Sequence, residues 1–73
     1  MTVGQNFTEK GITYTVTAVE TTEELEARGL NNVARLNREH KIVRHILAKR
    51  PKGTKSYMFY QYACGTVRFV TAV

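Results

Sequence analysis

The segment NNVARLNREHKIVRHILAK, residues 31–49, decides how this chain folds. At roughly 100° per residue, four side chains lie within about 60° of Leu36 on one helical face, namely Val33, His40, Val43 and Leu47. Asn31 or Asn32 is suited to cap the start of such a helix, and Pro51 stops it. The pattern predicts one main helix that packs its apolar face against a sheet.

A shorter helix is predicted just before this segment. Thr21 and Glu24 have the spacing of a capping box, in which each side chain bonds the backbone N–H of the other residue. Acidic residues in the first turn favour the same helix start, because they lie at the positive end of the helix dipole. Gly29 either ends this helix or bends a single long one, and the sequence is compatible with both.

Alternating side chains predict strands on both sides of the helical region. Residues 11–19 alternate Ile, Tyr, Val and Ala with three threonines, which is a period of two. Residues 7–11 predict a short partner strand and a turn, folded back as a hairpin. Residues 56–63 and 66–73 are rich in strand-forming side chains and predict a second hairpin, with its turn at residues 64–65.

These elements predict an α+β fold in a single domain, residues 1–73. The expected architecture is a small antiparallel sheet of three or four strands packed against one main basic helix, with a short helix before it. A chain of 73 residues buries only about 60% of its unfolded surface, so the expected core is modest.

The charges are sorted along the chain. Residues 1–27 contain one Lys against five Glu, a net charge of −4, whereas residues 28–55 contain nine Lys and Arg against Glu39 alone, a net charge of +8. Arg68 completes the formal net charge of +5. Like charges gathered in one stretch repel each other, so this stretch predicts an acidic partner, either a nucleic acid or a protein surface.

One predicted binding surface lies on the main helix. Helical geometry places Ile42 and Ile46 on a flank among basic residues, so that an apolar anchor is surrounded by cations, as at protein–protein interfaces. The alternative is that both isoleucines pack against the N-terminal hairpin or the first helix, while the bases only solvate the helix. The predicted partner-binding residues are Arg35, Arg38, Ile42, Ile46 and Lys49.

The aromatic C-terminal hairpin is a second candidate surface. One face of each strand belongs to the core, and the other is free to present tyrosines beside basic side chains, as a stacking platform for single-stranded nucleic acid. Cross-strand aromatic packing is the structural alternative. The residues predicted for nucleic-acid binding are Lys52, Lys55, Tyr60, Tyr62 and Arg68.

No catalytic or metal-binding pattern is present. His40 and His45 are five residues apart, which turns them away from each other on a helix, so they cannot share a metal ion. His40 lies on the apolar face and is expected in the core, whereas His45 is expected in solvent. Cys64, the only cysteine, has no neighbouring base in the sequence and is expected to be a packed or half-exposed thiol. The sequence predicts a binding protein without cofactor or metal, and not an enzyme.

The N-terminus, the apolar runs and the cysteine count predict where the protein resides. The N-terminus has no signal-peptide pattern, no apolar run is long enough to span a bilayer, and a single cysteine forms no internal disulfide. The expected address is the cytoplasm, and the expected state is a monomer.

The chain also resembles a known group of proteins. Its length of 73 residues, its opening Met1-Thr2-Val3-Gly4 and its basic stretch over residues 35–55 are similar to the small regulators of host RNA polymerase that lytic phages encode, such as that of a Xanthomonas phage. The resemblance covers the whole chain. It implies a protein that binds the host polymerase in the host cytoplasm, inhibits initiation at host promoters and promotes readthrough of terminators. The basic stretch would then face the polymerase, or its RNA and DNA.

Overall fold

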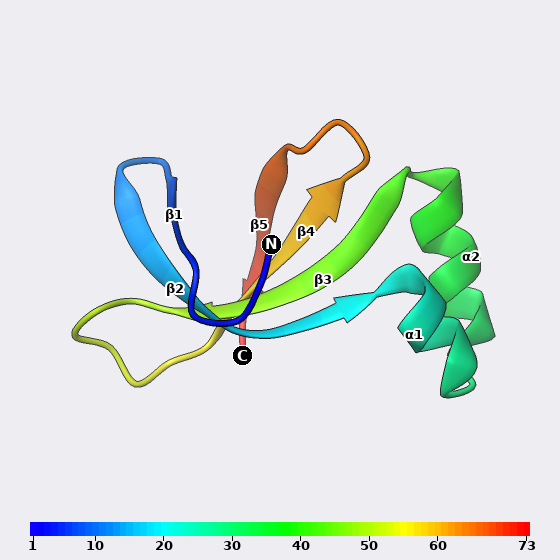
Figure 1. Ribbon diagram of the computed structural model, residues 1–73, viewed down its shortest axis with the longest axis horizontal. Helices are drawn as coiled ribbons and strands as arrows, with labels where there is room; N and C mark the ends of the chain where they lie inside the picture. The colour runs from blue at the N-terminus through cyan, green and yellow to red at the C-terminus, as the bar shows by residue number, and fades with distance from the viewer.

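The computed structural model describes all 73 residues, which form five strands and two short helices (Figure 1). In chain order the elements are β1 (Asn6–Glu9), β2 (Ile12–Thr21), α1 (Thr22–Ala27), α2 (Asn31–Glu39), β3 (Ile42–Lys49), β4 (Tyr57–Tyr62) and β5 (Val67–Ala72). The strands form one antiparallel sheet in the order β1-β2-β3-β4-β5. The two helices form a hairpin between β2 and β3.

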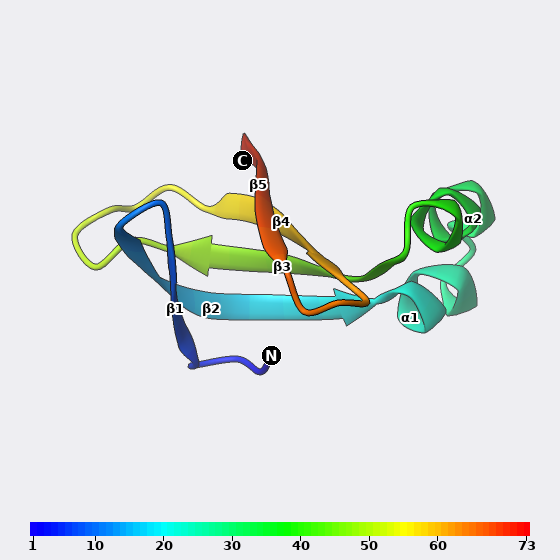
Figure 2. The same cartoon turned by 90° about the horizontal axis from the view of Figure 1, so that it is seen from above.

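The predicted fold class is wrong in two respects. The sheet has five strands, not three or four, and the helical hairpin lies at one end of the sheet instead of across its face (Figure 2). The predicted main helix stops at Glu39, and its second half is strand β3. The residues expected to cover the sheet therefore form its central strand.

The helix prediction failed because a spacing of four residues suits both a helix and a strand. Ile42 and Ile46 are four apart, as are Val43 and Leu47, and each pair shares one face of either element. Three of these four residues are β-branched, which favours the strand. Lys41, with a φ of 60°, turns the chain out of α2 immediately before β3.

The two predicted hairpins are confirmed. The β1–β2 hairpin turns at Lys10 and Gly11, whose φ values of 51° and 81° are those that a two-residue type I′ turn requires. The β4–β5 hairpin closes where the N–H of Tyr62 donates to the carbonyl of Thr66 at 2.9 Å. Its turn contains Gly65, which has a φ of 94°.

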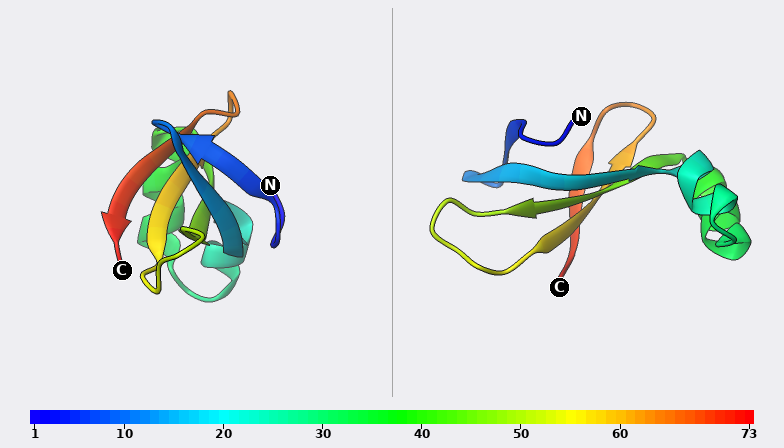
Figure 3. Two further views of the ribbon diagram at one scale, coloured as in Figure 1. Left: turned by 90° about the vertical axis from the view of Figure 1, so that its left-hand side faces the viewer. Right: turned by 60° about the horizontal axis from the view of Figure 1, so that its bottom comes forward.

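The sheet curls until its two edge strands approach each other. The backbone N–H of Phe69 in β5 donates to the Glu9 carboxylate in β1 at 3.1 Å. The left view of Figure 3 looks along the molecule and shows the strands wrapping round. Irregular pairing interrupts three of the four strand pairs, and such bulges bend and twist strands locally.

The core lies inside this curl and is largely aromatic. Phe59 is fully buried, and its ring makes edge contacts with Phe7, Tyr14 and Phe69 at centroid separations of 5.0, 4.8 and 5.8 Å. The buried residues of this cluster are Tyr14, Val16, Ile46, Ala48 and Phe59. Side chains from all five strands thus meet around one ring.

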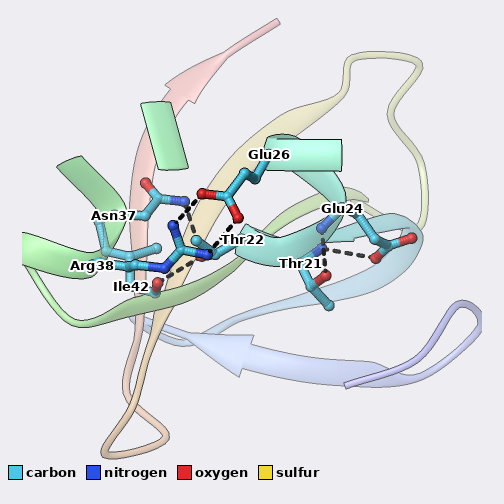
Figure 4. A network of polar contacts seen from close by, with 7 residues as sticks. All are labelled: Thr21, Thr22, Glu24, Glu26, Asn37, Arg38 and Ile42. Carbon is cyan, nitrogen blue, oxygen red and sulfur yellow. Dashed lines mark hydrogen bonds and ion pairs between the residues drawn. The ribbon is translucent and has the colours of Figure 1, made fainter. Parts of the chain in front are cut away.

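The first helix begins as predicted. The Thr21 hydroxyl accepts from the Glu24 N–H at 3.1 Å, and the Glu24 carboxylate accepts from the Thr21 N–H at 2.9 Å, which completes the capping box (Figure 4). Gly29, with a φ of 91°, separates the two helices. The predicted asparagine cap of α2 is wrong, because Leu30 occupies that position without a side-chain bond.

A buried polar contact fastens the helical hairpin to the sheet. The Asn37 amide donates to the Thr22 hydroxyl at 3.3 Å, and this hydroxyl donates to the Ile42 carbonyl at 2.9 Å (Figure 4). Asn37 and Thr22 are only 3% and 2% exposed. The predicted apolar face is rotated as a consequence: Leu36, its expected centre, is 48% exposed.

Candidate nucleic-acid interface

Folding separates the charges along the 35 Å axis of the molecule. The end that carries the helices holds five of the six acidic residues: Glu20, Glu23, Glu24, Glu26 and Glu39. The opposite end, formed by the β1–β2 turn, the end of β3 and the β3–β4 loop (Figure 1), holds five basic residues: Lys10, Lys49, Arg50, Lys52 and Lys55. We call this second set the basic end.

Ion pairs neutralise arginines only at the helical end. Arg28 donates to both carboxylate oxygens of Glu20, and Arg38 does the same to Glu26. The bond from Arg28 holds the pKa of Glu20 below its ordinary value, and Arg38 has the same effect on the pKa of Glu26. These are the two ion pairs of the structure, so none of the five basic residues of the basic end is ion-paired.

The β3–β4 loop begins with a turn that orders the basic end. The Gly53 N–H donates to the Arg50 carbonyl at 3.2 Å, with Pro51 and Lys52 between them. Pro at the second position and Gly at the fourth are the preferences of a type I turn, because Pro presets the required φ. Lys52 and Lys55, both predicted for nucleic-acid binding, lie exposed in this loop.

The other predicted nucleic-acid residues lie on the outer face of the sheet. Tyr60 of β4 pairs with Arg68 of β5, and both side chains point away from the core side that Phe59 occupies. Tyr62 follows two residues later on the same face, and both tyrosines are half-buried. The structure therefore divides the predicted set into two groups, the loop lysines and this outer face.

His45 adds an aromatic ring to the outer face. Its imidazole stacks on Tyr60 with centroids 4.6 Å apart, and its Nε2 lies 3.0 Å from Nδ2 of Asn37. Burial lowers the pKa of His45, against an opposing effect of nearby Glu20. The expectations for the two histidines are thus reversed, since His45 is half-buried and His40 is exposed.

The predicted partner-binding residues do not form one surface. Ile42 and Ile46 are 6% and 0% exposed, so neither is available to a partner. Ile46 belongs to the core cluster, whereas Ile42 lies beyond an irregularity of β3, where it pairs with Tyr62. The remaining residues are exposed but separated: Arg35 and Arg38 lie on α2, and Lys49 lies at the far end of β3. The predicted surface required a helix through residues 31–49, and the strand replaces it.

Sequence reasoning missed Arg50. Its guanidinium carbon lies 4.5 Å from the centroid of the Tyr57 ring and 5.6 Å from that of Tyr14. Its Nη2 donates to the Tyr14 hydroxyl at 3.3 Å, and this bond raises the pKa of Arg50. The position before a Pro-Lys-Gly turn is the one local signal, because the aromatic partners are distant in sequence.

Cys64 is exposed in the β4–β5 turn, beside a hollow of about 330 Å³ that His40, Lys41 and Arg68 also line. Its Sγ lies 3.2 Å from the Thr66 hydroxyl. The pKa of the thiol is lowered mainly because the Thr66 O–H can donate to the thiolate, with a smaller effect of Arg68. No hydrogen bond joins the thiol to a histidine. The hollow thus contains cations but no general base bonded to sulfur.

An apolar groove of about 600 Å³ lies between the helical hairpin and the outer face of the sheet. Leu25, Leu30 and Val33 contribute from the helical side, while Leu47 and Met58 contribute from the strands. Its apolar lining is of the kind that binds apolar side chains or small ligands.

Two further observations bear on function. The structure contains no group of three or more His, Cys, Asp or Glu side chains that could hold a metal ion. Neither helix is long and apolar enough to cross a membrane. Comparison with protein families, with curated proteins and with solved structures finds no match to this chain.

Proposed function

We propose that this protein binds single-stranded nucleic acid through the basic end and the adjoining outer face of β4 and β5. The observation that carries the proposal is that residues 40–73 contain seven Lys and Arg side chains and no Asp or Glu. These residues form β3, β4, β5 and their loops, so this part of the chain supplies only positive charges to a polyanion. The carboxylates next to it come from β1 and β2: Glu9 accepts from the Phe69 N–H, and Glu20 pairs with His45.

Phosphate groups of a nucleic acid would neutralise the Lys and Arg side chains that form no ion pair within the protein. Lys and Arg that neutralise phosphates release condensed counterions, which supplies most of the affinity of sequence-independent binding. Arg28 and Arg38 are already neutralised by carboxylates, whereas the basic end has no ion pair. The basic end is therefore the part of the molecule best suited to a phosphate backbone.

The side chains of the outer face favour binding of single-stranded over double-stranded nucleic acid. Tyr60 and Tyr62 are half-exposed on β4, and Arg68 lies opposite Tyr60 on β5. Unpaired bases stack on such rings with little sequence preference, whereas bases inside a duplex are covered by their neighbours. Tyrosines beside an arginine thus favour a strand with free bases.

The proposal is tested by fluorescence anisotropy with a labelled oligothymidylate of about 12 nucleotides. We expect affinity to fall between about 50 and about 200 mM salt, with a log–log slope of about −0.7 for each phosphate contact. Lys52→Gln with Lys55→Gln should flatten this slope. Tyr60→Leu or Tyr62→Leu should cost about 1–3 kcal/mol, because Leu keeps apolar bulk but loses the flat ring.

Arg35→Gln is the control for each single change, Lys52→Gln or Lys55→Gln, since it also removes one positive charge, here from an exposed helical position. It should leave the affinity nearly unchanged. Circular dichroism melts of each variant separate lost binding from lost folding. Absence of binding at the lowest salt concentration, or equal losses in Arg35→Gln and the loop variants, would refute the proposal.

A second proposal rests on the resemblance to phage regulators and on one observation, the apolar groove between the helices and the sheet. In it the protein acts in the cytoplasm of a bacterial host, binds RNA polymerase there, inhibits initiation and promotes readthrough of terminators. A pulldown with tagged protein from nuclease-treated bacterial lysate distinguishes the two proposals. Polymerase subunits that are retained after nuclease treatment support this second proposal, and their loss supports the first. A Leu30→Glu variant that retains polymerase would count against the groove.

A further inference from the structure

One arginine of the basic end is held in place by neutral aromatic groups. The guanidinium group of Arg50 lies over the Tyr57 ring, 4.5 Å from its centroid, and donates to the Tyr14 hydroxyl at 3.3 Å. Tyr14 itself is 3% exposed and packs against Phe7 and Phe59, so its hydroxyl is positioned by the core. The orientation of Arg50 is thus set before any ligand arrives.

The charge of Arg50 remains available because no carboxylate pairs with it. Glu9 lines a neighbouring hollow, but its carboxylate accepts from the Phe69 N–H and forms no ion pair. Arg28 and Arg38, in contrast, direct two N–H groups each at a carboxylate. Arg50 therefore differs from these arginines in having an anchored position without an anionic partner.

A groove adjoins this guanidinium. It has a volume of about 620 Å³, within the usual range for ligand sites, and its walls are Arg50, Lys52 and Tyr57 on one side and residues 11–13 on the other. Lys52 belongs to the turn that the Gly53–Arg50 backbone bond closes, which keeps its backbone next to the arginine. Lys10 lies outside the groove, in the β1–β2 turn, where it lines the neighbouring hollow together with Glu9.

We propose that this groove is a phosphate-binding site, in which Arg50 and Lys52 bind one phosphate group of a nucleic acid. Guanidinium groups bind phosphate oxygens through paired N–H bonds, and a side chain that is already fixed loses less conformational entropy on binding. This inference rests on the proposed function and locates the anchoring phosphate at the basic end, away from the tyrosines of the outer face.

The site is tested by NMR titration of the whole ¹⁵N-labelled chain with adenosine 5′-monophosphate, inorganic phosphate and adenosine. The two phosphate-bearing ligands should shift amide signals of residues 10–13 and 50–57, and adenosine should not. Arg50→Gln should weaken binding of the monophosphate about tenfold, and Arg50→Lys should have a smaller effect, because it keeps the charge but loses the planar donor pair. Arg35→Gln serves as the charge-matched control.

Lys52→Gln keeps the test valid should Arg50→Gln unfold the chain, because Lys52 is an exposed turn residue. It should weaken both the monophosphate and the oligothymidylate. Saturating shifts with adenosine alone, or monophosphate affinities unchanged in both Arg50→Lys and Lys52→Gln, would overturn the phosphate site.

Binding of oligothymidylate distinguishes failure of the phosphate site from failure of the proposed nucleic-acid binding. If oligothymidylate binding depends on Tyr60 and Tyr62 but not on Arg50 or Lys52, the phosphate site is refuted while nucleic-acid binding stands. Binding of the monophosphate without any binding of oligothymidylate means that the groove takes free phosphate esters and refutes the nucleic-acid ligand. If neither ligand binds, both proposals fail.

Discussion

The imidazole ring of His45 stacks on the phenol ring of Tyr60, with centroids 4.6 Å apart and an angle of 22° between the planes. The two residues face each other across β3 and β4, and Nε2 of His45 also reaches Asn37 of α2. This one side chain therefore joins the candidate interface to the helical hairpin. Its protonation should affect both.

We expect acid to weaken the fold through His45. Burial lowers its pKa in the folded state, so the unfolded chain binds the proton more readily. The contribution of neutral His45 is fully present above its unfolded pKa of about 6.5 and is lost as the pH falls through the folded value. Melting curves between neutral pH and about pH 4.5, the ordinary pKa of a glutamate carboxyl, isolate this effect.

His45→Gln should remove this pH dependence, whereas His40→Gln, which changes an exposed histidine, should keep it. Identical pH profiles for the two variants would show that His45 is not the group responsible.

Replacement of Ile46 tests the position of β3. Ile46 is fully buried, so Ile46→Ala should lower the free energy of unfolding by about 2–5 kcal/mol. Leu36→Ala removes a side chain that is 48% exposed and should cost no more than about 0.5 kcal/mol. Chemical denaturation of both variants measures the difference. The reverse order of effects would restore the helix that the sequence pattern predicted.

Two glycine substitutions test the turns at the basic end. Gly11 has a φ of 81°, which a residue with a Cβ adopts at a cost of about 1–2 kcal/mol, so Gly11→Ala should destabilise the β1–β2 hairpin by that amount. Gly53 has no positive φ, and an added Cβ would meet the Arg50 Cβ at an ordinary distance of 3.7 Å. Gly53→Ala should therefore be neutral or slightly stabilising. Equal losses in thermal melts would contradict these turn assignments.

Cys64 should react with a thiol reagent in the folded protein. The thiol is exposed, and the bond to Thr66 lowers its pKa, which raises the fraction of reactive thiolate near neutral pH. Thr66→Val should slow the reaction, and Thr54→Val, which changes an exposed threonine of the β3–β4 loop, should not. The rate is followed by absorbance of the released chromophore. A rate that is the same in both variants would show that Thr66 does not activate the thiol.

Local sequence determined those elements whose signals lie within a few residues. Thr21 and Glu24 alone specify the capping box, and residues 10 and 11 specify a tight turn, because both rest on contacts between near neighbours. The alternating pattern of β2 likewise predicted a strand. The sequence also determined the candidate nucleic-acid residues Lys52 and Lys55, since a loop containing Pro and Gly exposes its lysines whatever the rest of the fold.

Tertiary structure decided the state of residues 42–49, which the β-branched side chains favour only weakly. Their four-residue spacing fits a helix and a strand equally well, and pairing with β2 and β4 selects the strand, because only an extended chain satisfies both neighbours and buries Ile46 against Phe59. The same pairing separates the residues of the predicted partner-binding surface, because it buries Ile42 and Ile46 and places Lys49 far from Arg35 and Arg38. It also brought Arg50 to Tyr14, which is 36 residues away in the sequence, and a contact of that range leaves no local pattern by which it could have been predicted.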